Sequence, residues 1–432
     1  MIATLIIAIL TFVAIVLSLF LFPKVRIKKF YFHSYWIIAS IGALILIAAQ
    51  LVPLKEIVAE LTADSNINPL KILLLFFSMT IISILLDEFG LFRYLASVAA
   101  KRAKSQRVLF FSFYFLIALL TVFTSNDVVI LTFTPFICFF CRRMKINPIP
   151  YLVAEFAAAN TWSLLFIIGN PTNIFLGTSA GISFIEYFKV MVLPTIAAGA
   201  VELGILYLLF RSKLSGKIGE IDHQVEKIEN IPMLIVGVIH LVTCLVFLVI
   251  SNYINLEMWM ISLVTAASLL FISSILAVTM KRNSEYVTQA IKRLPYPLIP
   301  FFLAMFVIVV SLNYQGISNE IAKLYGSSNT VWVYGFTSFM MSNVINNIPM
   351  SILYTGLCSY LEQGVYLKGI YASIIGSNVG AFLTPIGALA GIMFIDLVND
   401  HDVKFTFIDF VKYGAIIALP TISMALLVLY VI

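Results

Sequence analysis

Long runs of apolar residues without charge are the feature that most constrains this chain. Residues 2–22, 32–54 and 231–250 contain no Asp, Glu, Lys or Arg, and a helix needs about 20 such residues to cross a bilayer. Apolar residues make up 61 % of the 432-residue chain and charged residues 11 %, against roughly 45–50 % and about 25 % in soluble domains. A soluble protein of this composition would expose large apolar patches and aggregate. The sequence therefore predicts a polytopic membrane protein and excludes a soluble enzyme, a disordered chain and a nucleic-acid-binding module.

The charges between the runs predict the orientation, because Lys and Arg collect in cytoplasmic loops. Loop 23–30 has four basic residues and loop 89–107 has five, so we expect both loops inside and the N-terminus outside. No basic residue precedes run 2–22 and no small-residue cleavage site ends it, which disfavours a cleaved signal peptide. Loop 211–230, the longest charged segment, is also placed inside. We expect a multi-pass protein of the plasma (inner) membrane.

Residues 108–141 are predicted to form a re-entrant helical hairpin. The run is uncharged except for Asp127, and the loops at both of its ends are basic, so a single crossing is excluded. Two full spans would need about 40 residues plus a turn, whereas this run has 34. Its middle reads TSND at 124–127, a polar tip. Irregular backbone at membrane depth is tolerated where it is buried in protein or lines a cavity, so we expect the tip in such a place.

Residues 149–176 are predicted to form a broken helix. The sequence GNPTN at 169–173 interrupts the apolar run, and a proline inside a helix removes a backbone donor and breaks the helix. The second half of the chain has the same plan. Residues 324–361 are uncharged with the polar sequence SNVINN at 342–347 near their middle, and residues 369–395 are interrupted by TPIG at 384–387. We therefore expect a second re-entrant hairpin and a second broken helix.

The two halves also match in register, which predicts an internal duplication. The matching pairs are Gly90 and Gly316, Asn126 and Asn343, and Asn160 and Asn378, with offsets of 226, 217 and 218 residues. Each half has five crossings, an odd number, so the second half is inverted relative to the first. We predict an all-α polytopic fold of about ten transmembrane helices in two inverted repeats, 1–210 and 231–432, joined by the cytoplasmic linker 211–230. Broken helices in inverted repeats indicate the binding site of a secondary transporter.

Polar side chains gather at the two tips and the two breaks, where we predict a site for a small solute or ion. An unpaired backbone group at the membrane midplane costs several kcal/mol, so these amides and hydroxyls could serve only to satisfy freed backbone groups. Alternatively, they coordinate a solute together with the half-helix N-termini, and their clustering at four symmetry-related positions favours this. The candidate binding residues are Ser125, Asn126, Asp127, Asn160, Asn170, Thr172, Asn173, Ser342, Asn343, Asn346, Asn347, Ser377, Asn378 and Thr384.

Two carboxylates are candidates for proton coupling. Asp127 is the only Asp, Glu, Lys or Arg between Arg107 and Arg142, and a charged residue inside a membrane is functional by default. Glu155, five residues before Asn160, is the second candidate. The competing interpretations are a helix cap for Asp127 and an interfacial position for Glu155.

Other polar residues receive no binding role. We expect Asp87 and Glu88 at the membrane interface, and no role is assigned to Glu202, which lies deep in a span. The four Cys residues lie in apolar stretches and are interpreted as buried. No metal site and no cofactor are predicted. The chain has no Walker A sequence, so we expect no enzyme and no ATP hydrolysis, and transport would depend on a gradient or on a partner.

Five motifs occur along the chain: LLDEFG at 85–90, ND at 126–127 followed by LTFTP at 131–135, GNPTN at 169–173, NNIP at 346–349 and TPIG at 384–387. They resemble those of the ion-transporter superfamily, most nearly the arsenite permease (ArsB) family. The resemblance implies a scaffold and a transport domain, with elevator-like movement of hairpins and broken helices. It implies export of arsenite or antimonite in exchange for protons, and hence arsenic resistance. A homodimer and an ATPase subunit are partners that the resemblance allows.

The solute and coupling ion are left open among three transport functions. These are a proton-coupled arsenite exporter, a sodium- or proton-coupled transporter of carboxylates or other anions, and a Na⁺/H⁺ antiporter. The break at 169–173 looks more like that of broader anion-permease relatives. A carboxylate at the tip repels an anion strongly in a low dielectric, whereas Asp127 is compatible with neutral As(OH)₃ or a coupling cation. The expected partners are a small inorganic solute or anion, H⁺ or Na⁺, and membrane lipid, with no nucleic acid.

Overall fold

The computed structural model describes residues 1–432 except 23, 28–29, 66–67, 219–226, 229 and 280–284, and these described residues are almost entirely helical. The first half comprises α1 (Ile2–Leu21), β1 (Lys24–Ile27), β2 (Phe30–His33), α2 (Ser34–Ala48), α3 (Leu54–Thr62), α4 (Pro69–Glu88), α5 (Leu91–Arg102), α6 (Gln106–Phe123), α7 (Asn126–Met144), α8 (Ile149–Trp162), η1 (Ser163–Leu165), η2 (Ile167–Gly169), α9 (Pro171–Ser179) and α10 (Phe184–Phe210). Strands β1 and β2 pair antiparallel, with Lys24 opposite His33.

The second half repeats the order of helices. It comprises α11 (Ile231–Ile250), α12 (Met258–Thr279), α13 (Glu285–Lys292), α14 (Leu298–Tyr314), α15 (Ile317–Tyr325), α16 (Thr330–Ile345), α17 (Asn347–Cys358), α18 (Gln363–Gly380), η3 (Pro385–Gly387), α19 (Leu389–Asp400) and α20 (Phe407–Val431). The described helices thus form two series of ten, in which α4 corresponds to α14, α6 to α16 and α8 to α18. Part of the proposed linker 211–230 lies outside the described residues, so the division there stays a prediction.

Among the described residues, six helices are long and apolar enough to cross a membrane, namely α4, α6, α10, α11, α12 and α20. A seventh span results if α14 and α15, which meet at a bend of 77°, are taken together. Val264, Phe271 and Val278 of α12 lie seven residues apart and are each exposed, as expected of a stripe that faces lipid. These features confirm an all-α polytopic membrane protein, while the total of about ten spans stays a prediction.

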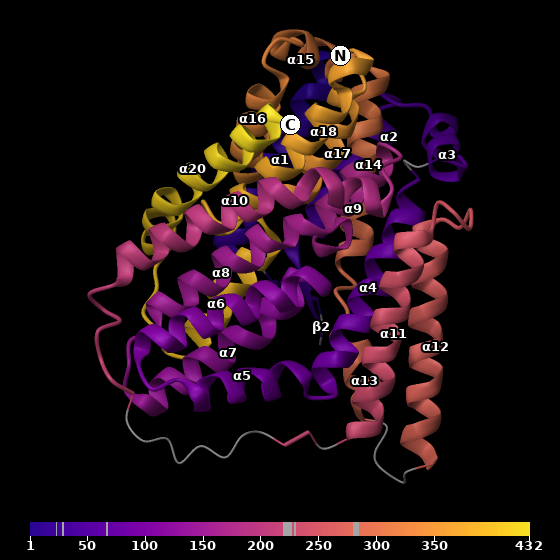
Figure 1. Cartoon of the computed structure of the whole chain (residues 1–432). Coiled ribbons are helices and arrows are strands. Elements are labelled where there is room, and N and C mark those ends of the chain that lie inside the picture. The colour runs from indigo at the N-terminus through magenta and orange to yellow at the C-terminus, as the bar shows by residue number, and fades with distance from the viewer. Residues whose placement is uncertain (23, 28–29, 66–67, 219–226, 229, 280–284) are drawn as a thin grey trace.

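Two matched glycines show how the repeats are related. Gly90 before α5 and Gly316 before α15 both have positive φ, 90° and 73°, a backbone conformation that glycine adopts without steric cost. Helices α5 and α13 lie at one end of the molecule, whereas α15 and α3 lie at the other (Figure 1). The corresponding helices α5 and α15 are therefore at opposite ends, as inverted repeats require. Which end faces the cytoplasm stays a prediction.

The chain reverses or breaks at the four polar sequences identified above. Thr124 and Ser125 separate α6 from α7, and Asn346 separates α16 from α17 with a φ of 72°, a region in which Asn is enriched among non-glycine residues. Pro171 begins α9 and Pro385 begins η3, where the missing N–H of a first-turn proline costs nothing. The sequence thus encodes each interruption locally.

Close helix packing then fixes these interruptions in space. Helix α16 packs along α18, α6 along α8 and α10 along α20, while α4, α11 and α12 run side by side at one edge of the molecule (Figure 1). Gly376 and Gly380 of α18 lie against Ser338 and Ser342 of α16. Small residues four positions apart let two membrane helices approach closely, and this contact carries the second hairpin against the broken helix.

Candidate functional site

The first hairpin tip is bonded to the first broken helix. Asn126, which begins α7, donates from Nδ2 to Asn160 Oδ1 of α8 at 3.3 Å, and Asn160 donates to the Phe156 carbonyl at 2.8 Å. The N–H of Ser125 donates to Ser83 Oγ of α4 at 3.3 Å. The side chains that meet at this tip are buried, namely those of Ser125, Asn126 and Asn160. The tip therefore lies in protein, as its polarity requires.

Asn378 joins the broken helices of the two halves. Its Oδ1 accepts from Ser163 Oγ at 2.8 Å, and its Nδ2 donates to Asn173 Oδ1 at 2.6 Å and to the Ile374 carbonyl at 2.9 Å. Asn173 in turn donates to the Ser163 carbonyl at 2.8 Å. These three side chains are fully buried. Residues 205 and 215 positions apart are thus held in one hydrogen-bonded network.

The second tip is bonded to the second break. Asn343 Oδ1 accepts from both the backbone N–H and the hydroxyl of Thr384, at 3.1 and 2.7 Å, and Asn343 Nδ2 donates to the Gly380 carbonyl at 3.0 Å. Asn346 donates to the Ile386 carbonyl at 2.9 Å. This cluster repeats the logic of the first half, with amides that satisfy backbone groups freed by a broken helix.

Two asparagines cap the half-helices that begin at these interruptions. Asn170 Oδ1 accepts from the backbone N–H and the hydroxyl of Thr172, both at 3.1 Å, at the start of α9. Asn346 Oδ1 accepts from the N–H of Ile348 at the start of α17. Helices α7 and α19 begin without a side-chain cap. Their first N–H groups therefore lack a side-chain acceptor and carry the partial positive charge of a helix N-terminus.

Several polar atoms of the candidate residues have no hydrogen-bond partner within the described residues although they are buried. They are Ser125 Oγ, Asn126 Oδ1, Asn170 Nδ2 and Ser377 Oγ. Unpaired polar atoms in the interior are costly and rare. Their occurrence beside the tip and both breaks is what a site for a polar solute requires.

The two coupling candidates differ in their surroundings. Asp127 lies in the first turn of α7, one position after its first residue, while the N-cap position is Ser125. Its half-buried carboxylate makes no hydrogen bond or ion pair with the described residues. Glu155 is fully buried and accepts a hydrogen bond from Thr134 of α7 at 2.9 Å on one oxygen, whereas the other oxygen has no partner in the described chain. Glu155 therefore lies in the protein interior, while its depth relative to the membrane interface stays a prediction.

Asp87 and Glu88 form a separate charged cluster. Arg293 contacts Asp87 at 2.7 Å and Glu88 at 2.6 Å, and Thr132 of α7 donates to Asp87 at 2.9 Å. The cluster joins the end of α4 to the hairpin and to the segment after α13. Within the described ranges, no group of three His, Cys, Asp or Glu side chains could hold a metal ion.

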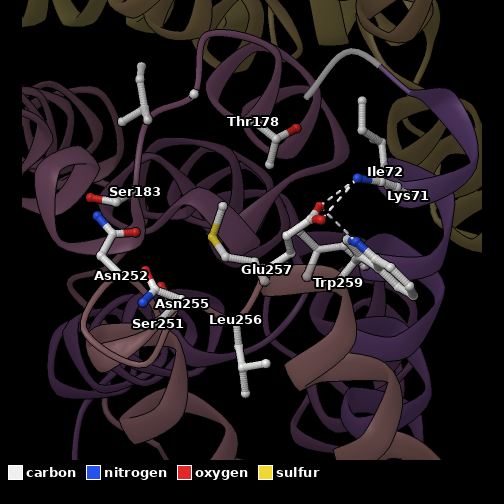
Figure 2. A pocket seen from close by; sticks show the side chains of 14 residues that line it. Lys71, Ile72, Thr178, Ser183, Ser251, Asn252, Asn255, Leu256, Glu257 and Trp259 are labelled. Carbon is white, nitrogen blue, oxygen red and sulfur yellow. Dashed lines mark hydrogen bonds and ion pairs between the residues drawn. The ribbon is translucent and has the colours of Figure 1, made fainter. Parts of the chain in front are cut away.

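A cavity of about 400 Å³ opens between the first turn of α4, the segment after α9 and the α11–α12 loop (Figure 2). Lys71 projects into it and pairs with Glu257 at 2.8 Å and with Asp64 at 2.5 Å. Trp259 donates to Glu257 at 2.9 Å. The hydrogen bond and positive charge of Lys71 lower the pKa of Asp64 below its usual value. Sequence reasoning missed this cavity, as it missed Ser83 and Ser163, because none of them belongs to a tip or a proline break.

Two hairpins, two broken helices and a buried polar network between them define a multi-pass membrane transporter. The family model described as citrate transporter (CitMHS) matches residues 12–366. The chain belongs to this family and, more broadly, to the ion-transporter superfamily near the arsenite permeases.

Curated relatives match over most of the chain. An arsenical pump membrane protein of Escherichia coli is 24 % identical over 402 residues, which cover 90 % of this chain and 91 % of the relative. The protein of the same name from strain K12 is 26 % identical over 366 residues, or 81 % and 84 % of the two chains. A 46 kDa membrane protein of Mycobacterium leprae is 25 % identical over 378 residues, or 83 % and 85 %.

The fold is also similar to that of a solved transporter. The YdaH transporter of Alcanivorax borkumensis superposes with a TM-score of 0.57 at 15 % identity, over 99 % of this chain and 97 % of that one. This likeness supports the fold and carries no information about the solute.

Proposed function

We propose that the protein exports arsenite or antimonite across the plasma membrane in exchange for protons, as a secondary active transporter. The single observation that carries the proposal is the set of unpartnered, buried polar atoms at the tip and breaks. Asn126 Oδ1 is an acceptor, Asn170 Nδ2 is a donor, and the hydroxyls of Ser125 and Ser377 can act as either. A solute that fits must offer both donors and acceptors, as the three hydroxyls of As(OH)₃ do.

The rival solutes fit this set less well. A sodium ion takes oxygen ligands and repels the N–H donors of Asn170. Carboxylate groups offer acceptors only, so succinate leaves Asn126 Oδ1 unsatisfied and citrate can donate to it only through its single hydroxyl. The nearby Asp127 carboxylate repels both anions. The citrate transporter family and the GNPTN sequence at 169–173 favour the anion alternative, which is therefore the second candidate.

Asp127 is the proposed proton-coupling residue, with Glu155 as the second candidate. Asp127 stands beside Asn126, and its carboxylate makes no hydrogen bond or ion pair with any described residue, so a proton can add to it without breaking a contact. A helix cap is the competing role, but the N-cap of α7 is Ser125. Movement of the hairpins and broken helices would carry the solute, and the cavity at Lys71 is the proposed outer opening. Helix α9 connects the two places, because it begins beside Asn170 and Thr178 near its end lines the cavity.

The test is uptake into inverted membrane vesicles under an imposed pH gradient. Arsenite, antimonite, citrate and succinate are compared as solutes, and Na⁺/H⁺ exchange is followed separately. We expect arsenite and antimonite to accumulate with the gradient, and Asp127→Asn to bind solute but lose accumulation. Accumulation of citrate or succinate in place of arsenite would establish the anion transporter. Normal accumulation by Asp127→Asn would remove Asp127 from the mechanism.

A further inference from the structure

A third buried carboxyl, Glu202, lies behind the candidate site. It is on α10 and fully buried. Tyr114 of α6 donates to its Oε1 at 3.0 Å, and Thr161 of α8 makes a short hydrogen bond to its Oε2. The carboxyl forms no ion pair with the described Lys and Arg residues. An ionised carboxylate without a counter-charge is expensive in such a place, so its hydrogen bonds decide which form is stable.

The Tyr114 hydroxyl has more contacts than it can satisfy with one proton. Its oxygen lies 3.0 Å from the Gly199 carbonyl and 3.0 Å from Glu202 Oε1, and it accepts from Trp162 Nε1 at 3.1 Å. A tyrosine hydroxyl donates one hydrogen bond. If Glu202 is ionised, Tyr114 donates to the carboxylate. If Glu202 is protonated, its O–H donates to Tyr114 and the tyrosine proton turns to the Gly199 carbonyl, so that every contact is made.

The absence of a side chain at Gly199 leaves space for the indole ring of Trp162. A Cβ atom on this residue would lie 2.7 Å from the Trp162 ring, so any larger residue displaces the donor to Tyr114. Trp162 and Thr161 end α8, directly after Asn160, whose side chain binds the hairpin tip through Asn126. A change at Glu202 is therefore one residue away from the solute network.

Among the described residues, the other titratable groups on the surrounding helices contact other partners or make no hydrogen bond or ion pair with Glu202. Glu155 of α8 contacts Thr134, and His240 of α11 contacts Ser268 and the Val236 carbonyl. Helix α20 carries Asp409, which caps its own first turn, and Tyr413, which packs on Phe210. Glu202 makes no hydrogen bond or ion pair with Lys412 or Tyr430 of α20 or with Arg107 of α6. Within the described chain, Tyr114 is thus the titratable side chain that contacts Glu202.

We propose that Glu202 is a second proton-binding site of the transporter, which takes up and releases a proton while the Tyr114 hydroxyl switches between Glu202 and the Gly199 carbonyl. The inference rests on the proposed exchange with protons. On release, the carboxyl O–H bond breaks and the proton passes to water that reaches the site when the end of α8 moves. On uptake, the proton returns to the same carboxyl oxygen. Glu202 acts on the solute through Thr161 and Asn160 and does not touch it.

Infrared difference spectroscopy of the purified, lipid-reconstituted protein tests this directly, without any transport measurement. A protonated buried carboxyl gives a C=O band separate from those of carboxylates, and the band shifts in D₂O. We expect a pH titration to show a band of this kind that disappears reversibly at high pH and is missing in Glu202→Gln, and its absence in this variant distinguishes it from bands of Asp127 or Glu155. Addition of arsenite is expected to change its intensity. The exposed Glu362→Gln is the matched control and should keep the band.

Further variants keep the test decisive. Tyr114→Phe retains the carboxyl but removes its partner, so the band should move to higher frequency, and Gly199→Ala should shift it by displacing Trp162. If Glu202→Gln does not fold, these two shifts carry the assignment. The proposal would be overturned if the band that Glu202→Gln removes persists through the whole pH range in which the protein is folded, or if Glu202→Gln, Tyr114→Phe and Gly199→Ala leave every such band unchanged.

The outcome can be separated from that of the proposed function. If vesicles transport citrate and not arsenite while the Glu202 band still titrates, the solute assignment fails and the proton site stands. If arsenite is exported with a pH gradient by Glu202→Gln as efficiently as by the natural protein, proton exchange at Glu202 is not part of the coupling. Loss of gradient-driven accumulation in Glu202→Gln, with exchange of labelled for unlabelled solute retained, is the result expected.

Discussion

The contact between Asn378 and Asn173 allows a quantitative test of how the two halves meet. The Nδ2 of Asn378 donates to Asn173 Oδ1 at 2.6 Å, and both side chains are fully buried. Among the described residues, no other group donates a hydrogen bond to Asn173 Oδ1. Replacement of Asn378 by Ala leaves that oxygen unpartnered, which costs about 1–3 kcal/mol. The loss of the hydrogen bond from Ser163 Oγ to Asn378 Oδ1 and the cavity left by the missing Asn378 amide add to this cost. We expect Asn378→Ala to lower the free energy of unfolding by about 2–4 kcal/mol.

A double-mutant cycle isolates the pair. Hydrogen bonds between membrane helices contribute about 0.6 kcal/mol on average and up to about 1.7 kcal/mol, and the short, buried contact places this pair near the upper value. The unfolding of Asn173→Ala, Asn378→Ala and the double variant is followed by circular dichroism in mixed micelles with increasing SDS. The coupling energy should lie between about 1 and 1.7 kcal/mol.

The control is Asn399→Ala, an exposed asparagine of α19, which should change stability by less than about 0.5 kcal/mol. A coupling below about 0.3 kcal/mol, the value typical of independent sites, would refute the inference that the two broken helices are bonded to each other. Full stability of Asn378→Ala would refute the burial of its amide.

Three further outcomes follow from the packing and charge. Gly376→Leu should lower the melting temperature strongly, because overpacking costs about 1–3 kcal/mol or more where Gly376 meets Ser338, whereas Gly364→Ala, with open space around it, should not. Arg293→Gln should lower the free energy of unfolding in SDS by about 1–3 kcal/mol, less than the roughly 3–5 kcal/mol for breaking a fully buried pair, because the Arg293 side chain is 30 % exposed. Adding Asp87→Asn to this variant should recover part of the lost stability, because it removes the unpaired carboxylate. Lys71 lowers the pKa of Asp64, so the ion pair stabilises the fold fully at pH values above the ordinary carboxyl pKa of about 3.9. This stabilisation is lost as the pH falls through the lowered pKa of Asp64. The small difference in melting temperature between the natural protein and Asp64→Asn should vanish in acid and shrink in high salt.

The sequence was sufficient to locate the four interruptions at polar sequences, because each has a local chemical cause. It did not indicate that α8 ends at Trp162 or that α14 and α15 meet at a bend of 77°. Pro171 and Pro385 begin the segments after the breaks, and the polar residues at Ser125 and Asn346 mark the hairpin turns. Local sequence could not indicate which of these elements meet. The bond from Asn378 to Asn173 depends on how α18 packs, and that packing depends on the small residues at Gly376 and Gly380.

Charged residues were harder to place than polar ones. Asp87 and Glu88 were expected at the membrane interface, and nothing near them in the chain identifies Arg293 as their partner, about 205 residues away. Glu155 is fully buried and accepts a hydrogen bond from Thr134 of the neighbouring hairpin, a partner that its own helix does not predict. Burial of a carboxyl is set by the helix opposite, which no pattern within its own helix records.

The chemistry of the site bears on why a transporter would hold its solute with amides instead of charges. The hydrogen bonds of Asn126, Asn173 and Asn378 run to other amides, hydroxyls and backbone groups, and each such group contributes a donor or an acceptor without net charge. Under the proposed function a neutral trihydroxide would be recognised by this pattern with little desolvation cost, whereas an anion of similar size, such as arsenate or phosphate, would depend on the uncapped N-termini of α7 and α19. The same neutrality is consistent with the proposal that Asp127 is a charge that changes when a proton binds beside the solute. In that proposal, amides recognise the solute and carboxyls, Asp127 at the tip and Glu202 on α10, bind the protons, so that recognition and coupling are functions of different side chains.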